Sequence, residues 1–532
     1  MSTGTEPGGE RADGAGTARN VAAQGSVVAG MTLLSRISGF ARDMVLSHFF
    51  GAGAAADAFF VAFRIPNFFR RMFAEGAFAQ AFVPVLARYR SGDGGALREF
   101  VSTVFGNLAA AVWSVSLLGV LLAPVFVAVF APGFWNDAAQ FDRAAGMLRV
   151  TFPYLGFIAL TAFAAALQNS YHRYAVPAFT PVLLNLTLIA AMLFAVGWFE
   201  EPVYALAWGV FAAGALQLAF QLPALGRLGL LVPPRLGVSH PGVRQVGKLM
   251  LPALFAASAS QINTVVDTIL ASTLITGSIS WLYYADRLLE LPIGLVAVAL
   301  GTVLLPNLSR LVSTGDERGF AATLDWGVRM GVLLGLPAAA ALYVLALPLV
   351  AGLFYHGEMT ALDARMAALA LQAFAVGLLP LVLVKVVAPA YYAREDTATP
   401  FRFALVSVVT NVVLNLALFS WLGHVGLALA TAAAGWVNAG LLLRGLAGPG
   451  APPARRYRPG RAVYATAARA AFATAVMAAA LGVMLPPPEA WLEAGVWQRT
   501  LWLAATVPAG GICYLLVLLA SGERLATFLH RA

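Results

Sequence analysis

The sequence predicts an all-α polytopic membrane protein with fourteen transmembrane helices. Three observations predict it: 60% of the 532 residues are hydrophobic and only 11% are charged, apolar stretches of spanning length recur from end to end, and the connections between them alternate in charge. A helix of about 20 residues crosses the roughly 30 Å hydrocarbon core of a bilayer. This composition excludes a large soluble enzyme.

The connections set the expected topology. Those after even-numbered helices carry arginines, such as Arg88 and Arg173, whereas those after odd-numbered helices are neutral or acidic, as at Glu200 and Glu201. The positive-inside rule then predicts that both termini are cytoplasmic, which requires an even number of helices. The predicted helices lie near residues 26–50, 57–90, 101–131, 144–172, 175–198, 202–224, 243–274, 279–311, 322–355, 361–393, 399–421, 423–444, 461–485 and 497–520.

An internal repeat predicts two lobes. The sequence VPVLAR (83–88) ends the second helix and LPNLSR (305–310) ends the eighth, while Pro177 and Pro400 open the fifth and eleventh at nearly the same offset. We expect two six-helix lobes related by a pseudo-two-fold axis, although chance similarity of proline-containing helix ends is the alternative. The predicted parts are a disordered cytoplasmic tail (1–24), an N-lobe (25–226), a cytoplasmic linker (227–242), a C-lobe (243–445), a second cytoplasmic linker (446–460), and two added helices with a C-terminal tail (461–532).

Arginines inside the predicted spans indicate a hydrated cavity. An arginine at the bilayer centre costs about 2.5–3.5 kcal/mol on insertion scales, so several together cannot face lipid. These arginines are Arg36, Arg42, Arg64, Arg70, Arg71 and Arg287, and the nearby acids are Asp43, Asp57, Glu75, Asp286 and Glu290. The surplus positive charge and the planar guanidinium favour a pyrophosphate or similar polyanion. Interlocking ion pairs that only hold the bundle together are the alternative.

A second polar group lies in the predicted C-lobe. Asp267 interrupts the apolar seventh helix, Asn411 and Asn415 share one face of the eleventh at a spacing of four, and Thr431 lies in the twelfth. Carboxylate, amide and hydroxyl oxygens suit Na⁺ or a titrating proton. A hydrogen-bond cluster that only packs the lobe is the alternative.

Several function classes lack their signatures. Cys513 is the only cysteine, so there is neither an intrachain disulfide nor a cysteine-based metal site. No nucleotide-binding Gly-rich loop and no His-Glu-x-x-His pair occur, so uphill transport would draw on an ion gradient or the membrane potential. The net charge of +9 lies in short connections and inside spans, which argues against nucleic acid as a partner.

The charged segments also resemble a known family. The sequences SRISGFARD (35–43), FGAG (50–53), DAFFVAFRIPN (57–67) and RRMFAEGAF (70–78) closely resemble the MurJ/MviN family of bacterial lipid II flippases, in the multidrug/oligosaccharidyl-lipid/polysaccharide exporter superfamily. The resemblance continues through YYADRLLE (283–290), GTVLLPNLS (301–309) and DTATP (396–400). It leaves out the N-terminal tail and the sequence of the last two helices.

The resemblance implies a function in cell-wall synthesis. The implied cargo is undecaprenyl-pyrophosphate-linked disaccharide-pentapeptide, which is moved across the inner membrane to the periplasmic leaflet. We expect a monomer that works by alternating access. The two added helices would form a groove for the lipid tail. The implied site comprises Arg36, Arg42, Arg70 and Arg287, with Ser35, Asp57, Asn67 and Glu75 as associated positions and Arg64 where some relatives have lysine. A polysaccharide-unit flippase or a drug exporter of the same superfamily is the alternative, and an integral-membrane transferase is a third class.

Overall fold

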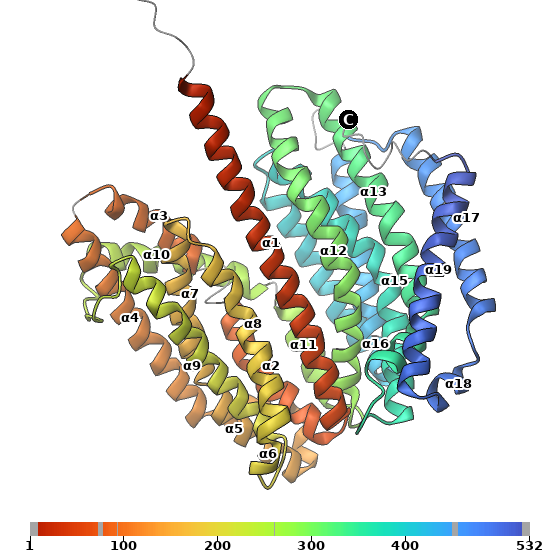
Figure 1. Ribbon diagram of the computed structural model, residues 1–532, viewed down its shortest axis with the longest axis horizontal. Helices are drawn as coiled ribbons and strands as arrows, with labels where there is room; N and C mark the ends of the chain where they lie inside the picture. Colours follow the sequence, from red (N-terminus) through yellow and green to blue (C-terminus); the bar gives the residue numbers. More distant parts are fainter. Residues whose placement is uncertain (1–8, 73–77, 93, 260, 449–455, 524–532) are drawn as a thin grey trace, which may run out of the picture. The chain divides into compact units, whose positions relative to one another are not determined.

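A computed structural model describes residues 9–72, 78–92, 94–259, 261–448 and 456–523, and its regular structure over these ranges is helical (Figure 1). The prediction of an all-α protein is therefore confirmed. The helices group into two units, which we describe separately. Unit 1 comprises residues 1–46, 58–130 and 134–261, and unit 2 comprises 47–57, 131–133 and 262–532.

Unit 1 is built on an aromatic core. Phe82 of α3 stacks on Phe100 of α4 with ring centroids 5.7 Å apart and lies 5.2 Å from Phe163 of α7. All three rings are buried, and they hold these helices together by the hydrophobic effect. The helices of this unit are α1 (Gly9–Phe50, whose last residues belong to unit 2), α2 (Ala54–Met72, from residue 58), α3 (Phe78–Arg90), α4 (Gly94–Leu121), α5 (Ala123–Phe130), α6 (Ala138–Thr151), α7 (Tyr154–Ser170), α8 (Ala175–Ala190), α9 (Tyr204–Arg227) and α10 (Pro241–Ala259).

Helix α10 belongs to unit 1, whereas the sequence predicts that the C-lobe begins at residue 243. Val246 of α10 is buried in the aromatic core. The preceding segment lies on α4, where Arg235 N donates to Ser102 O at 3.1 Å and Ser102 Oγ donates to Pro233 O at 2.5 Å. A Cβ at Gly106 would overlap the Arg235 backbone, so this close approach requires glycine. Packing on α3 and α4 decided which unit α10 joins.

Unit 2 is organised around α15, which packs against α12, α13 and α16. Within α16, Gly423 has φ 57° and ψ −135°, and Ser407 Oγ donates to Ala434 O across this break at 2.7 Å. The two halves therefore fold back on each other, as two separate predicted spans require. The helices of unit 2 are α11 (Ile262–Ser272), α12 (Ser278–Ser313), α13 (Glu317–Val344), α14 (Ala346–Leu353), α15 (Ala361–Tyr392), α16 (Ala398–Ala447), α17 (Arg461–Met484), α18 (Pro488–Glu493) and α19 (Val496–Ala520).

The segment 47–57 lies in unit 2, although the sequence places it inside the N-lobe. Glu358 N donates to His48 O at 3.0 Å, and Tyr284 Oη donates to Gly51 O at 2.8 Å. Gly51 has φ +57°, and a Cβ there would overlap the Glu358 carbonyl. Only glycine fits this turn, so the FGAG segment serves backbone packing.

The predicted spans agree with the helices to different degrees. Among the described residues, nine helices are long and apolar enough to cross a membrane, and the bent α12 raises this number to ten. The predicted first, second and seventh spans are outside that set. Helices α1 and α2, in the first and second spans, carry several charges. The second span is divided between α2 and α3, and the seventh between α10 and α11. The total of fourteen stays a prediction. Helix α1 begins at Gly9, inside the segment predicted as a cytoplasmic tail, and its alanines have high helix propensity. Residues 1–8 of that segment lie outside the described residues.

Candidate functional site

Arg42 is the centre of a buried network in unit 1. It is 6% exposed, and its Nη2 and Nε donate to Asp43 Oδ1 at 2.5 and 2.9 Å. Its Nη1 donates to Asn185 Oδ1 of α8 at 3.1 Å. The Asn185 amide in turn donates to Ser35 O at 3.1 Å and Ser38 Oγ at 3.0 Å. The network therefore joins α1 to α8, and the charge of Arg42 is matched by its neighbour on the same helix.

The other predicted cations of unit 1 are more accessible. Arg36 is exposed on α1, six residues before Arg42, and Arg64 is half-buried on α2. Six residues further along α2, Arg70 Nε donates to Asn67 Oδ1 at 2.8 Å, and both residues are half-buried. Glu75 lies outside the described residues. Arg71 is exposed at the end of α2, and its Nη1 donates to Gln261 Oε1 at 3.3 Å. Among the described residues, α1 and α2 thus present four guanidinium groups that solvent reaches, those of Arg36, Arg64, Arg70 and Arg71.

Arg287 carries the predicted cationic site into unit 2. It lies on α12, and its Nη1 is 2.8 Å from Glu290 Oε2 one turn away. The two side chains are 30% and 48% exposed, so solvent screens this ion pair. Arg287 therefore differs from Arg42, whose carboxylate partner is fully buried.

Asp57 caps a helix. Its carboxylate is 2% exposed and accepts hydrogen bonds from Gly277 N at 2.7 Å, Ser280 N at 2.9 Å and Ser280 Oγ at 2.5 Å. These donors lie at the start of α12, where Gly277 offers no side chain of its own. An acid here satisfies unpaired N–H groups and complements the helix dipole. The structure therefore gives this residue, predicted as cargo-associated, a contact that positions α12.

The four predicted cation ligands come together in unit 2. Asn415 Nδ2 donates to Asp267 Oδ1 at 2.7 Å and to Asn411 Oδ1 at 3.0 Å, and Asn411 Nδ2 donates to Thr431 Oγ1 at 3.2 Å. Asn411 and Asn415 are fully buried, and Asn415 Oδ1 has no hydrogen-bond partner among the residues that the structure describes. The donor set is oxygen-rich and includes one carboxylate, which fits a hard monovalent cation.

An apolar groove lies between α13 and the two added helices α17 and α19, which run side by side in Figure 1. It has a volume of about 280 Å³ and is lined by aliphatic residues, including Leu334, Met477 and Leu515, and by the small residues Gly510 and Gly511. Gly511 leaves open space beside α19, whereas Gly510 is buried against Leu481 of α17. A groove of this chemistry can hold a hydrocarbon chain.

A charged clamp fixes the added helices, and the sequence reasoning missed it. Glu523 is 3% exposed and lies 2.8 Å from Arg329 Nη2 of α13 and 2.9 Å from Arg469 Nη1 of α17. Asp325 of α13 accepts a 2.6 Å hydrogen bond from Tyr457, and burial together with this bond raises the pKa of the phenol. The available signals were two charged residues, Asp325 and Arg329, inside an apolar span.

Comparison with known proteins identifies the family. The family model described as "Lipid II flippase MurJ" matches residues 46–493. A protein of Vibrio cholerae serotype O1 named "Probable lipid II flippase MurJ" is 46% identical over 510 residues, covering 94% of this chain and 96% of its own. The chain belongs to the MurJ family. The predicted resemblance is confirmed, and membership makes the chain a transporter of the bacterial inner membrane and not an enzyme.

Further relatives agree with this membership. The "Lipid II flippase MurJ" of Burkholderia cenocepacia is 42% identical over 424 residues, which cover 79% of this chain and 82% of the relative. Among solved structures, "Lipid II flippase MurJ, inward closed conformation" has a TM-score of 0.76 at 24% identity, covering 92% of this chain and 97% of its own. A multidrug resistance MATE family transporter of the MOP superfamily has a TM-score of 0.63 at 14% identity, covering 78% and 95%. These two structures show the shared fold.

Proposed function

We propose that this protein translocates lipid II, the undecaprenyl-pyrophosphate-linked disaccharide-pentapeptide, from the cytoplasmic to the periplasmic leaflet by alternating access of its two units. The observation that carries the proposal is the match to the MurJ family over residues 46–493. The accessible arginines on α1, α2 and α12 support it, because a diphosphate needs fixed positive charge in a hydrated interior. We further propose that the protein acts as a monomer with both termini in the cytoplasm.

The arginines divide into two roles in this proposal. Arg36, Arg64, Arg70 and Arg287 are half-buried or exposed, and they would bind the diphosphate. Arg42 would position α1 through Asp43 and Asn185, so that the preceding turns of α1 keep their orientation. Ser35 would help to hold α1 by accepting from Asn185, and Asn67 would orient Arg70 by accepting from its Nε. Glu75 stays a predicted member of the site.

The cargo has an apolar end as well. The groove between α13, α17 and α19 would hold part of the polyprenyl tail, since its lining is aliphatic and it lies on helices added to the lobes. The Glu523 clamp would keep α17 against α13 and thereby maintain this groove. Energy would come from the membrane potential or from Na⁺ bound at Asp267, Asn411, Asn415 and Thr431.

Complementation of a bacterium depleted of its own lipid II flippase tests the proposal. The wild-type chain restores growth and exposes labelled lipid II at the outer leaflet, whereas Arg36→Ala and Arg70→Ala do neither at equal protein level. Arg88→Ala is the control, because Arg88 is exposed on α3 outside the proposed site. Normal growth and translocation with Arg36→Ala and Arg70→Ala would contradict the assigned site. Vesicles that carry a different polyprenyl-linked sugar test the polysaccharide-unit alternative, which predicts transport of that lipid in preference to lipid II.

A further inference from the structure

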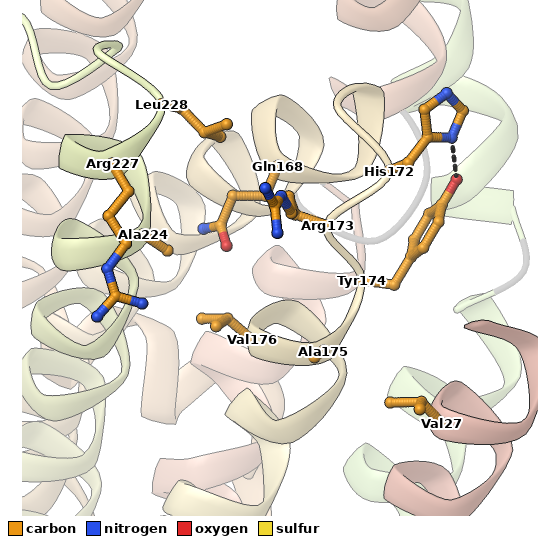
Figure 2. Close-up of a pocket in the computed structure, with 10 residues that line it drawn as sticks. All are labelled: Val27, Gln168, His172, Arg173, Tyr174, Ala175, Val176, Ala224, Arg227 and Leu228. Atoms are coloured by element: carbon orange, nitrogen blue, oxygen red, sulfur yellow. Dashed lines mark hydrogen bonds between the residues drawn. The ribbon is translucent and has the colours of Figure 1, made fainter. Parts of the chain in front are cut away.

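Unit 1 contains a cationic pocket whose lining includes none of the arginines of α1 and α2. Its lining residues are drawn in Figure 2. It is formed by the turn between α7 and α8, the end of α9 and Val27 of α1, and its volume is about 470 Å³. The positive-inside rule predicts that this end is cytoplasmic. The described lining residues include Gln168, His172, Arg173 and Arg227, and none of them is acidic.

The positive charge of this pocket is not neutralised by the protein. Arg173 and Arg227 are exposed, and within the described part of the chain neither guanidinium makes a hydrogen bond or an ion pair. Helix α8 begins beside them at Ala175 and has no side-chain cap. The N–H groups of Ala175 and Val176 therefore add the positive end of a helix dipole to the two arginines. This arrangement favours a phosphate group.

Gln168 adds a hydrogen-bond acceptor that faces the same pocket. Its side chain is fully buried, and no described residue is a hydrogen-bond partner of its Oε1. Figure 2 shows its amide reaching across the pocket toward Val176, with the oxygen facing the start of α8. A buried acceptor without a partner is costly, which makes a donor on a bound ligand favourable.

A relay of hydrogen bonds fixes which end of the Gln168 amide is the acceptor. Thr180 Oγ1 donates to Val176 O at 2.9 Å, so it accepts from Gln221 Nε2 at 2.8 Å. Gln221 Oε1 then accepts from Gln168 Nε2. The nitrogen of Gln168 is thereby used inside the protein, and its oxygen is left for the pocket. Reversing the amides of Gln168 and Gln221 together would cost the hydrogen bond from Thr180 Oγ1 to Val176 O.

We propose that this pocket binds the headgroup of a lipid whose phosphate carries a neighbouring hydroxyl or ammonium donor, as in phosphatidylglycerol. Arg173, Arg227 and the start of α8 bind the phosphate oxygens, and Gln168 Oε1 accepts the donor. Val27, Val176, Ala224 and Leu228 contact the first carbons of the chains. A polyprenyl diphosphate shares the phosphate chemistry and is the second source of such a ligand. The proposal concerns lipid retention and does not rest on the proposed transport function.

Native mass spectrometry of the full-length protein, released from vesicles of phosphatidylglycerol and phosphatidylcholine, tests the proposal. The variant with Arg173→Gln and Arg227→Gln loses phosphatidylglycerol adducts about tenfold, the change that ~1.4 kcal/mol produces. The matched control carries Arg88→Gln and Arg244→Gln, which remove the same charge from exposed positions of unit 1 outside the pocket, and it keeps wild-type adducts. Equal loss of adducts in the pocket variant and in the control variant, or no loss in the pocket variant, would overturn the phosphate site.

Gln168→Met tests the acceptor separately. We expect this variant to keep its lipid adducts but to lose the preference for phosphatidylglycerol over phosphatidylcholine, whose quaternary ammonium cannot donate. A preference equal to that of the wild type would overturn the role of Gln168. The same variants with added undecaprenyl diphosphate identify the source. If the variant with Arg173→Gln and Arg227→Gln loses the phosphatidylglycerol adducts, the ligand of the pocket is a phospholipid. If it loses only the diphosphate adducts, the ligand is the phosphorylated cargo.

Discussion

Two buried polar clusters, one in each unit, use similar residues but differ in their balance of charge. In unit 1, Arg42 is matched by Asp43, and Asn185 completes its hydrogen bonds. In unit 2, Asp267 joins Asn411, Asn415 and Thr431, none of which carries positive charge. Within the described ranges, Asn415 Oδ1 has no hydrogen-bond partner. The charges and hydrogen bonds of the first cluster are therefore matched, and this cluster is a structural connection between α1 and α8. The second has the composition of a cation site.

The largest expected effect comes from removing the carboxylate of the unit 1 cluster. Asp43→Ala leaves the buried guanidinium of Arg42 without its carboxylate, and this should destabilise the protein by about 3–5 kcal/mol. The double variant Arg42→Met and Asp43→Leu removes both charges and should unfold close to the wild-type temperature. Thermal unfolding of the purified variants measures both effects. If Asp43→Ala unfolds at the wild-type temperature, the cluster is not a structural connection.

The second prediction concerns the cluster of unit 2. Sodium at about 100 times its Kd should stabilise the wild type by ~2.7 kcal/mol, because it binds only the folded state. Asp267→Asn should abolish this stabilisation while changing the unfolding temperature in potassium little. Melting curves in matched NaCl and KCl measure the difference, and Asp43→Asn serves as a carboxylate control in the other unit. A sodium response that survives Asp267→Asn would place the ion elsewhere.

A smaller loss should follow removal of the amide in unit 1. Asn185→Leu deletes the acceptor for Arg42 Nη1 and the donor to Ser35 O and Ser38 Oγ, which should destabilise the protein by about 1–3 kcal/mol. Chemical denaturation in detergent measures the change, with the exposed Asn136→Leu as the control. The sodium response should be retained, since the two clusters are separate. A change in that response would indicate that they are coupled.

The smallest effect is expected at Thr431. Thr431→Val removes the hydroxyl that accepts from Asn411 Nδ2 at 3.2 Å, which should reduce stability by about 0.5–1.5 kcal/mol. If this oxygen also binds the cation, the sodium concentration needed for half of the stabilisation should rise. A shift in stability without any shift in that concentration would assign Thr431 to packing alone.

Much of this protein can be predicted from the sequence, because the decisive signals are local. Hydropathy over about 20 residues predicts the all-α membrane fold, and the spacing of Asn411 and Asn415 places both on one helix face. Arginines inside apolar stretches likewise predict, from local sequence, that α1, α2 and α12 contribute to the cationic site. The resemblance of residues 35–78 to the MurJ/MviN family adds the family, which the comparisons confirm.

Other features depend on contacts between residues far apart in the chain. The assignment of α10 to unit 1, the capping of α12 by Asp57 and the clamp of Glu523 with Arg329 connect residues separated by many helices. Asp43 directly follows Arg42 in the sequence, so their pairing is local, but the burial of this pair against Asn185 of α8 depends on tertiary packing. The sequence by itself determined which segments become helices and where charge enters the membrane. Which of the charged side chains are buried depends on the neighbours that packing brings to each of them, and these neighbours come from distant parts of the chain.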